Sequence, residues 1–132
     1  MYIMKNQEET NMKESNLIEK VEILCKELTD TLHAAYKHTA NDYYDYSVGK
    51  KYIKIISNGS QTSVWGFINI SEFVKVRKME RVNGIVIKEV TFKEGDVLMS
   101  AGWNTPALNA PRGNLLKGYS AQGNMHGPGY LV

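Results

Sequence analysis

The segment Gly102–Leu115 combines the residue types that most often form a binding loop. It contains one tryptophan, two prolines, three asparagines and an arginine that is followed by glycine. Its apolar residues follow neither the helical nor the strand period, so an irregular conformation is expected. An irregular segment of rigid and polar residues is more often a binding loop than a plain connection. This loop is therefore the first candidate for a ligand site.

The side chains of the loop suit a small nucleotide. Trp103 offers a flat surface on which a base can stack, an interaction of about 1–3 kcal/mol in nucleic-acid complexes. Arg112 carries a planar guanidinium that can grip phosphate through two hydrogen bonds. Gly113 lets an anion approach the backbone amide, and Thr105 and Asn114 can bind a base edge or ribose hydroxyls. Together they predict a site for a nucleotide with a diphosphate and an exposed base.

Each of these residues also has a purely structural interpretation. Trp103 can cover the end of a sheet, and Arg112 can bind a carbonyl group or a carboxylate such as Glu89. Gly113 can satisfy a turn, which Asn114 can cap. Both interpretations stay open on the sequence alone.

Recognisable catalytic and metal-binding signatures are missing. His33 and His38 lie five residues apart on a predicted helix, about 140° around its axis, so they cannot share a metal ion. Cys25 lies among apolar residues at helical spacing and is expected to be an unreactive core residue. The acidic-aromatic stretch Asp42–Tyr46 could do acid–base work, but a solvated turn is the favoured interpretation. We therefore expect no metal, no cofactor and no catalytic group, although enzymes can assemble sites from scattered residues.

Helical periodicity is strongest in the N-terminal part of the chain. The predicted helix spans residues 15–38, after a flexible arm at 1–14. Its apolar stripe is formed by residues at steps of three and four: Leu17, Val21, Leu24, Leu28, Leu32 and Ala35. The stripe is expected to pack on a sheet, and its near-heptad spacing also suits a helix–helix contact in a dimer.

Short segments rich in β-branched and aromatic residues follow the helix. They are Lys51–Ile56, Ser63–Ile70, Gly84–Phe92 and Asp96–Ala101, with Phe73–Met79 as a further edge strand. Asn58-Gly59 predicts a turn between the first two, and Lys93–Asp96 predicts a tight hairpin between the last two. The expected fold class is α+β: one long helix on an antiparallel sheet of four to five strands within residues 48–101. Residues 102–132 are expected to form irregular loops, ending in the loop Gly123–Gly129 and a short strand Tyr130–Val132.

The overall composition sets further limits. A chain of 132 residues is expected to form a single domain, 1–132. Its 16 basic and 14 acidic residues give a net charge of +2, which argues against a duplex-DNA partner. No signal peptide and no apolar run of about 18 residues is present, so a soluble protein without a membrane partner is expected.

Several motifs together resemble those of a known family of phage proteins, the first Thoeris anti-defence family. These motifs are Lys51-Tyr-Ile-Lys-Ile, Ser63-Val-Trp-Gly-Phe, Gly95-Asp-Val-Leu-Met-Ser-Ala, Trp103, Pro106-Ala107 and Arg112-Gly-Asn-Leu. The resemblance implies a non-enzymatic sponge in the cytoplasm of the host bacterium. Such proteins bind the cyclic ADP-ribose signal (glycocyclic ADP-ribose) made by a TIR-domain protein and keep it from its effector. It also implies a homodimer, assembled into hexamers in some members, with separate sites for cyclic oligonucleotides.

The resemblance places the phosphate and ribose contacts on Arg112, Gly113 and Asn114, beside Trp103. Asn104 stands where a basic residue often follows the tryptophan, and a further arginine upstream of Arg112 is missing. Lys75, Arg77 or a residue from a partner chain could then supply a second phosphate contact. The full candidate ligand-binding set is Phe73, Arg77, Thr91, Trp103, Thr105, Arg112, Gly113 and Asn114.

Three functions are compatible with these observations. The first is the nucleotide sponge, and the second is a small enzyme that degrades a nucleotide. The third is a module for single-stranded nucleic acid or for protein partners, using Trp65, Phe67 and the basic stretch Lys75–Arg81.

Overall fold

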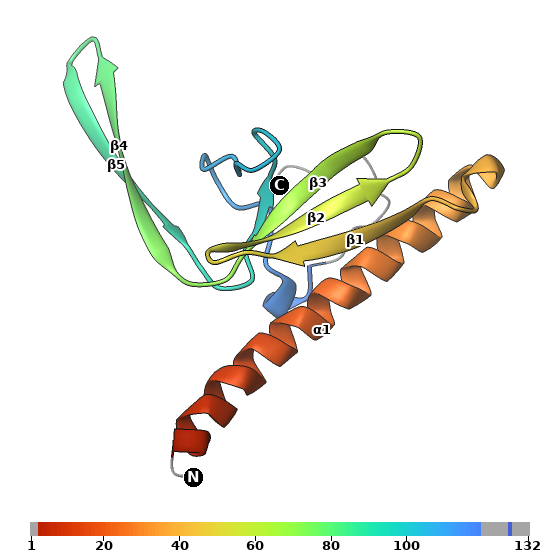
Figure 1. Ribbon diagram of the computed structural model, residues 1–132. Helices are drawn as coiled ribbons and strands as arrows, with labels where there is room; N and C mark the ends of the chain where they lie inside the picture. Colours follow the sequence, from red (N-terminus) through yellow and green to blue (C-terminus); the bar gives the residue numbers. More distant parts are fainter. Residues whose placement is uncertain (1–2, 120–126, 128–132) are drawn as a thin grey trace.

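The N-terminal helix packs along one face of a sheet through the apolar stripe that the sequence predicts (Figure 1). The computed structural model describes residues 3–119 and 127, and its helix α1 spans Ile3–Ala35. Leu17, Val21, Leu24 and Leu28 are all buried, because steps of three and four keep them on one side of the helix. The expectation of a long amphipathic helix is confirmed.

The bounds of α1 differ from the prediction at both ends. The residues expected to form a flexible arm are helical from Ile3 onward. Their sequence is rich in Glu, Lys, Gln and Met, which favour helix, and contains no Gly or Pro. The helix ends at Ala35 because Tyr36 adopts an extended conformation, and His38 lies in the short 3-10 helix η1, Lys37–Thr39.

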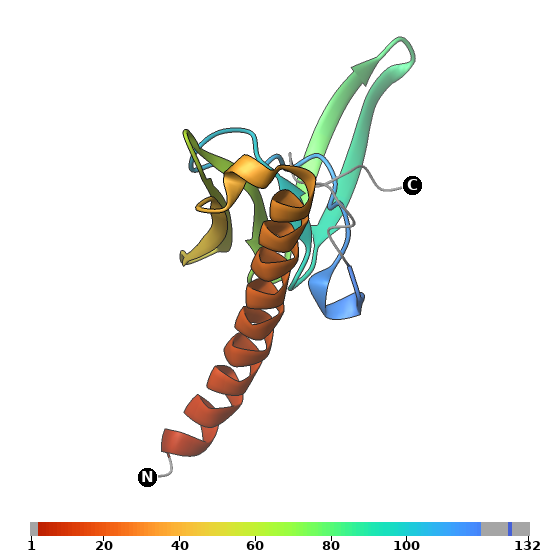
Figure 2. The same ribbon diagram turned by 90° about the vertical axis from the view of Figure 1, so that its right-hand side faces the viewer.

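A four-stranded antiparallel sheet forms the body of the molecule, in the order β1-β2-β3-β6. Figure 2 shows α1 running across this sheet. Side chains from the helix and from the facing side of the sheet fill the core between them. The strands are β1 (Tyr43–Val48), β2 (Tyr52–Asn58), β3 (Thr62–Asn69) and β6 (Val97–Met99).

Strand β1 replaces the solvated turn that was expected at Asp42–Tyr46. Tyr44 is buried and Tyr46 is half-buried, whereas Asp45 between them is exposed. The hydroxyl of Tyr46 donates a hydrogen bond of 2.9 Å to the carboxylate of Glu22 on α1. The alternation of aromatic and polar residues therefore follows the strand period, and the acidic residue lies on the outer face.

The remaining two strands form a separate ribbon, which we call the arm. It consists of β4 (Phe73–Arg81) and β5 (Gly84–Phe92), paired antiparallel in a two-stranded sheet. Both ribbon views show the arm extending away from the helix and the four-stranded sheet (Figures 1 and 2). The α+β class is thus confirmed, with four strands in the main sheet and two in the arm.

The predicted hairpin between β5 and β6 is wrong. The turn at Lys93–Asp96 exists, with Gly95 at φ +85°, but β5 pairs with β4 and β6 pairs with β3. Asn69 lies at the end of β3. Its backbone carbonyl accepts a hydrogen bond from the Gly95 amide at 2.8 Å, and its backbone amide donates one to the Asp96 carbonyl at 2.9 Å. These bonds direct the chain into the main sheet rather than back along β5.

Aromatic stacking and a buried amide fix the base of the arm. Phe73 stacks on Phe92 with ring centroids 5.0 Å apart, and Tyr52 meets Phe73 edge-on. The side-chain amide of Asn69 donates to the carbonyls of Ser71 and Lys93, one on each chain segment that enters the arm. The two connections are therefore tied to a single residue of the main sheet.

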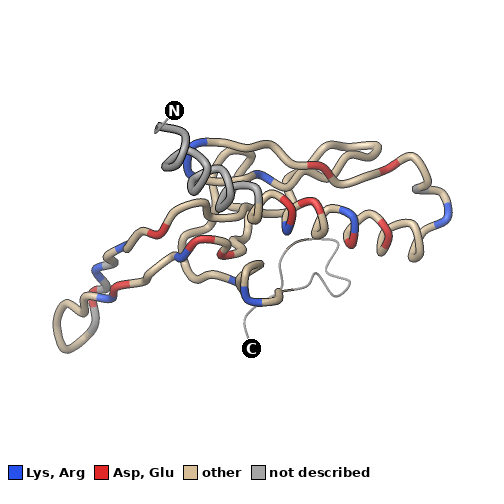
Figure 3. The backbone as a smooth tube through the Cα atoms, turned by 90° about the horizontal axis from the view of Figure 1, so that it is seen from below, with Lys and Arg blue, Asp and Glu red and all other residues tan. Residues whose placement is uncertain are grey.

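Charged positions of both signs occur along the coloured parts of α1 and of the arm (Figure 3). No helix within the described part of the chain is long and apolar enough to cross a membrane. The expected loop Gly123–Gly129, apart from Gly127, and the expected strand Tyr130–Val132 lie outside the described residues.

Candidate functional site

The arginine of the candidate loop lies beside β6 and not on a free loop. The amide of Arg112 donates to the carbonyl of Val97 at 2.7 Å, and the amide of Val97 donates to the carbonyl of Gly113 at 2.8 Å. Asp96 and Asn114 form an isolated antiparallel bridge next to these bonds. Arg112–Asn114 is therefore fixed as a short extended segment along the start of β6.

Trp103 and Thr105 lie at the opposite end of β6. The amides of Ala101 and Gly102 both donate to the carbonyl of Thr105, which closes a tight turn with Trp103 inside it. The Trp103 side chain is 50 % exposed, and the Lys54 ammonium lies 4.6 Å from its ring centroid. Such a contact is a cation–π interaction. The structure therefore separates the predicted stacking residue from the predicted phosphate grip.

A cavity of about 530 Å³ lies beside Arg112. It brings together four of the eight candidate residues: Thr91, Arg112, Gly113 and Asn114. Two lysines that the sequence reasoning missed also line it, Lys93 and Lys117. They carried no motif of their own, and only the packing of the turn after β5 against helix η2 (Leu115–Lys117) places them together.

Arg112 is one of the residues that line the cavity. The residue is only 7 % exposed, and its Nη2 donates to the Asn109 side-chain carbonyl across 3.4 Å, which is a long hydrogen bond. Asp96 also lines the cavity. Its carboxylate accepts hydrogen bonds from the backbone amide of Lys93 at 2.7 Å and from the side-chain amide of Asn114 at 2.9 Å. Three cationic side chains and one carboxylate thus surround the cavity, so an anionic ligand is electrostatically favoured there.

Asn114 is already engaged within the protein. Its Nδ2 donates to the Glu94 carbonyl at 2.8 Å and to the Asp96 carboxylate, and its Oδ1 accepts from the Leu116 amide at 2.8 Å. Both amide hydrogens are therefore used, because a side-chain amide has only two. Of the two interpretations of Asn114, the structural one as a cap describes its contacts.

Gly113 is required by its surroundings. Its φ of +153° lies where residues with a side chain are rarely found, and a Cβ atom there would collide with the ring of Tyr119. Tyr119 in turn packs against the main core. The absence of a side chain at Gly113 therefore permits this packing next to Arg112.

The other candidate residues lie outside the cavity. Phe73 is part of the aromatic stack at the base of the arm, and Arg77 lies farther along β4, opposite Lys88. Trp65 and Phe67, considered for base stacking, are buried in the main sheet at 3 % and 2 % exposure. They cannot present a ring face to a nucleic acid without unfolding.

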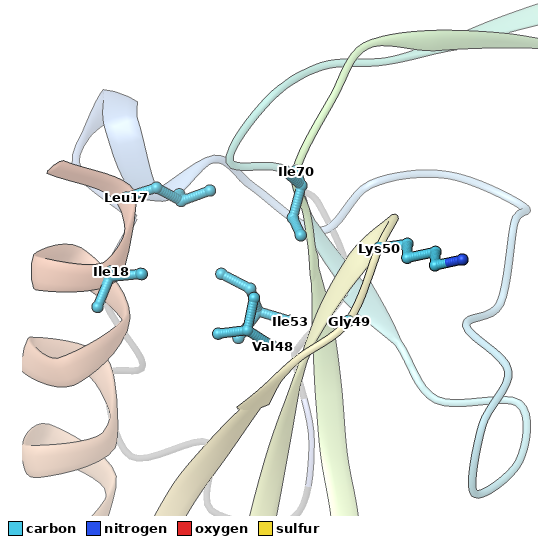
Figure 4. Close-up of a pocket in the computed structure, with 7 residues that line it drawn as sticks. All are labelled: Leu17, Ile18, Val48, Gly49, Lys50, Ile53 and Ile70. Atoms are coloured by element: carbon cyan, nitrogen blue, oxygen red, sulfur yellow. The ribbon is translucent and has the colours of Figure 1, made fainter. Parts of the chain in front are cut away.

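A second cavity, between α1 and the turn from β1 to β2, is apolar. It has a volume of about 270 Å³ and is lined by Leu17, Ile18, Val48, Gly49, Lys50, Ile53 and Ile70. Figure 4 shows the Lys50 ammonium pointing away from the aliphatic side chains. A third cavity, near the turn from β2 to β3, is lined by Asp42 and several serines. Neither combines a cation with polar groups as the Arg112 cavity does.

Among residues 3–119 and 127, no further cluster of metal-ligating side chains adds a second candidate site. Cys25 is buried, so the expectation of a core residue is confirmed. Burial, together with the nearby carboxylates of Asp45 and Glu22, raises the pKa of its thiol to about 12. No group of three or more His, Cys, Asp or Glu side chains suited to a metal ion occurs among the described residues.

Comparisons of the chain with models of protein families, with curated proteins and with solved structures find no match. The geometry of the cavity and the sequence resemblance are thus the observations on which a function can be based.

Proposed function

We propose that this chain binds a small nucleotide signal of the cyclic ADP-ribose type in the Arg112 cavity and holds it without cleaving it. The observation that carries the proposal is the convergence of Arg112, Lys93 and Lys117 on one cavity of about 530 Å³. Pockets for small ligands span about 300–1,000 Å³, so the size is suitable. A diphosphate would meet the Arg112 fork in the wall and the lysine ammonium groups at the rim.

The resemblance to the first Thoeris anti-defence family supports the choice of ligand. Under this proposal the protein acts as a sponge in the cytoplasm of an infected bacterium, lowering the concentration of the free signal. Arg112 is the central residue, and the exposed Thr91 hydroxyl on β5 can bind a ribose or phosphate oxygen. Asn114 and Gly113 contribute by shaping the wall of the cavity, because the Asn114 side-chain amide is already bonded within the protein. Cyclic oligonucleotide binding would require a separate site.

The test is isothermal titration calorimetry with glycocyclic ADP-ribose. Replacing both rim lysines (Lys93→Ala with Lys117→Ala) is expected to weaken binding by roughly 5- to 30-fold, because each partly solvated ion pair contributes about 0.5–1 kcal/mol. The matched control replaces two exposed lysines outside the cavity, Lys20→Ala with Lys50→Ala, and should bind as the wild type does. Equal affinity for all three proteins would contradict the proposed location.

Arg112→Lys separates charge from geometry. The substitution keeps one positive charge but removes the fork that binds two phosphate oxygens, so a larger loss than at either rim lysine is expected. Circular dichroism must show an intact fold, since Arg112 is nearly buried.

A sponge and an enzyme differ in what they release. After incubation and heat denaturation, mass spectrometry of the supernatant should show the signal unchanged. A cleaved product would favour the nucleotide-degrading enzyme. Binding to oligonucleotides that weakens steeply with salt would instead favour the nucleic-acid module.

A further inference from the structure

The pairing of the arm sorts its basic residues onto one face. Successive residues of a strand alternate between the two faces of a ribbon, and residues paired directly across an antiparallel ribbon share a face. One face, which we call the basic face, therefore carries the positions of Lys75, Arg77, Arg81 and Lys88. Within β4 and β5 no acidic residue occupies a position on this face.

The opposite face of the arm carries a mixed set of charges, Lys78, Glu80 and Glu89. Glu80 follows Lys78 by two positions along β4, and Glu89 lies diagonally across from Lys78 on β5. Lys78 thus has a carboxylate neighbour on each strand, whereas the cations of the basic face have none on their own face. The net charge of +2 for the whole chain averages over this difference.

The basic face contains an arrangement that is unfavourable by itself. Arg77 pairs directly with Lys88, and Lys75 lies two positions before Arg77 on the same face. Like charges directly opposite each other destabilise a sheet. A two-stranded ribbon has little stability to lose. A polyanion bound along this face would remove the repulsion, so the arrangement is suited to such a partner.

We propose that the basic face of the arm binds the phosphate backbone of duplex DNA. Lys75 and Arg81 are six residues apart on β4, which corresponds to about 20 Å at roughly 3.4 Å per residue. Each strand of a DNA duplex carries one phosphate per 3.4 Å of axis, so a row of this length faces several phosphates. A two-stranded ribbon also fits the major groove. The arm extends away from the helix and the main sheet, so a duplex can reach it (Figures 1 and 2).

The other residues of the arm favour duplex DNA over other polyanions. Proteins that bind single strands stack the bases on aromatic side chains. The only aromatic residues of β4 and β5, Phe73 and Phe92, stack on each other at the base of the arm. An anionic membrane would have to take up the opposite face, where the exposed Ile85 and Ile87 lie beside both glutamates. Neither a single strand nor a membrane therefore matches the arm as a duplex does.

This binding is independent of the ligand proposed for the Arg112 cavity. Thr91, the residue of β5 that lines the cavity, pairs with Val74 on the face opposite to the basic one. The basic face also makes no use of Trp65 and Phe67, which are buried in the main sheet. The two proposals can therefore be tested separately.

The salt dependence of binding tests the number of phosphate contacts. Fluorescence anisotropy with a labelled duplex of about 20 base pairs and mixed sequence measures the affinity at several KCl concentrations. The logarithm of the association constant falls by about 0.9 per logarithm of salt for each phosphate contact, so four cations predict a slope of about −3.6. This corresponds to roughly 150-fold weaker binding at about 200 mM than at about 50 mM KCl. Lys75→Ala with Lys88→Ala should reduce the slope to about −1.8.

Charge reversal on each face gives a matched pair of variants, Lys88→Glu and Lys78→Glu. Both exposed lysines lie in the arm, and both substitutions change the net charge equally. Lys88→Glu places a carboxylate opposite Arg77, so it should raise the melting temperature while weakening duplex binding at least about ten-fold near 100 mM KCl. Lys78→Glu adds a third carboxylate beside Glu80 and Glu89, so it should lower the melting temperature and weaken binding by less than about three-fold. A purely structural role of Lys88 would instead move stability and binding in the same direction.

Several results would overturn the proposal. They are no duplex binding by the wild type at about 50 mM KCl, equal losses of binding in the two glutamate variants, or a lower melting temperature for Lys88→Glu. Tighter binding to the single strand of the same sequence, or to vesicles containing phosphatidylserine, would also do so. The wild type and Lys88→Glu should behave alike with glycocyclic ADP-ribose in calorimetry, so failure of the DNA proposal is distinguishable from failure of the ligand proposal.

Discussion

Replacing Gly113 by alanine is the sharpest test of how the candidate cavity is built. The φ of +153° at this residue strains any side chain, and the added Cβ would meet the ring of Tyr119. The Gly113 carbonyl also accepts the Val97 amide, in the same ladder that holds Arg112. The substitution should therefore reduce stability and displace the guanidinium together.

The expected magnitude has two parts. Placing a side-chain residue at positive φ costs about 1–2 kcal/mol, and forcing an extra carbon into a packed site costs about 1–3 kcal/mol. Gly113→Ala should then lower the free energy of unfolding by about 2–5 kcal/mol. Gly118→Ala is the matched control, because Gly118 has a φ of +92° but no heavy atom within 4 Å of the added carbon. It should lose only the first part, about 1–2 kcal/mol.

Urea denaturation of four proteins isolates the collision: wild type and Tyr119→Ala, each with and without Gly113→Ala. Without the Tyr119 ring only the backbone strain remains, so Gly113→Ala should cost less in that background. Differential scanning calorimetry should agree, at roughly 3–5 °C per kcal/mol for a chain of this size. Equal costs for Gly113→Ala and Gly118→Ala, or a cost unaffected by Tyr119→Ala, would refute the reasoning.

Two further predictions concern residues that the fold uses internally. Asn114→Ala should lower the free energy of unfolding by about 2–3 kcal/mol in urea denaturation, because it removes the donor to the Glu94 carbonyl and to Oδ1 of the buried Asp96, whose Oδ2 keeps the Lys93 amide. Asn114→Asp should be no better, since a second carboxylate would then face Asp96, and recovery to wild-type stability would contradict the assigned contacts. Cys25, with a pKa of about 12, should resist iodoacetamide at pH 8 until the protein is unfolded; rapid labelling of the folded protein would show that the thiol is accessible. The pKa of an unfolded cysteine is near 9, so above pH 9 the unfolded state loses this proton first, and stability should fall as the pH rises. Cys25→Ala should remove that part of the pH dependence.

The long helix and most of the strands could be predicted from local patterns. Burial of Leu17, Val21, Leu24 and Leu28 follows from their spacing, because a helical period places them on one face whatever they pack against. The strands β2, β3 and β5 were located by their β-branched and aromatic residues. Strand β1 is harder to predict, because the acidic residues Asp42 and Asp45 also suit a solvated turn and the alternation of Tyr44 and Tyr46 covers only one short segment.

The pairing of strands and the composition of the cavity depended on tertiary structure. The turn at Lys93–Asp96 was recognised, but a turn does not specify which strand follows it as a partner. That choice was made by Asn69, far away in the sequence, through its hydrogen bonds to Gly95 and Asp96. Arg112 was identified by its type, whereas Lys93 and Lys117 were found only when the fold brought them beside it.

Trp103 and Arg112 are close in the sequence, which favours the prediction that they share a site. In the structure, however, Arg112 lines the cavity and Trp103 does not. The intervening loop folds back along β6, so residues nine positions apart lie at opposite ends of that strand. The sequence by itself determined the α+β elements, the buried faces and the cationic residue of the loop, because these follow from side-chain type and local period. Tertiary packing decided which residues share a cavity, because that depends on backbone hydrogen bonds between segments that are distant in the sequence.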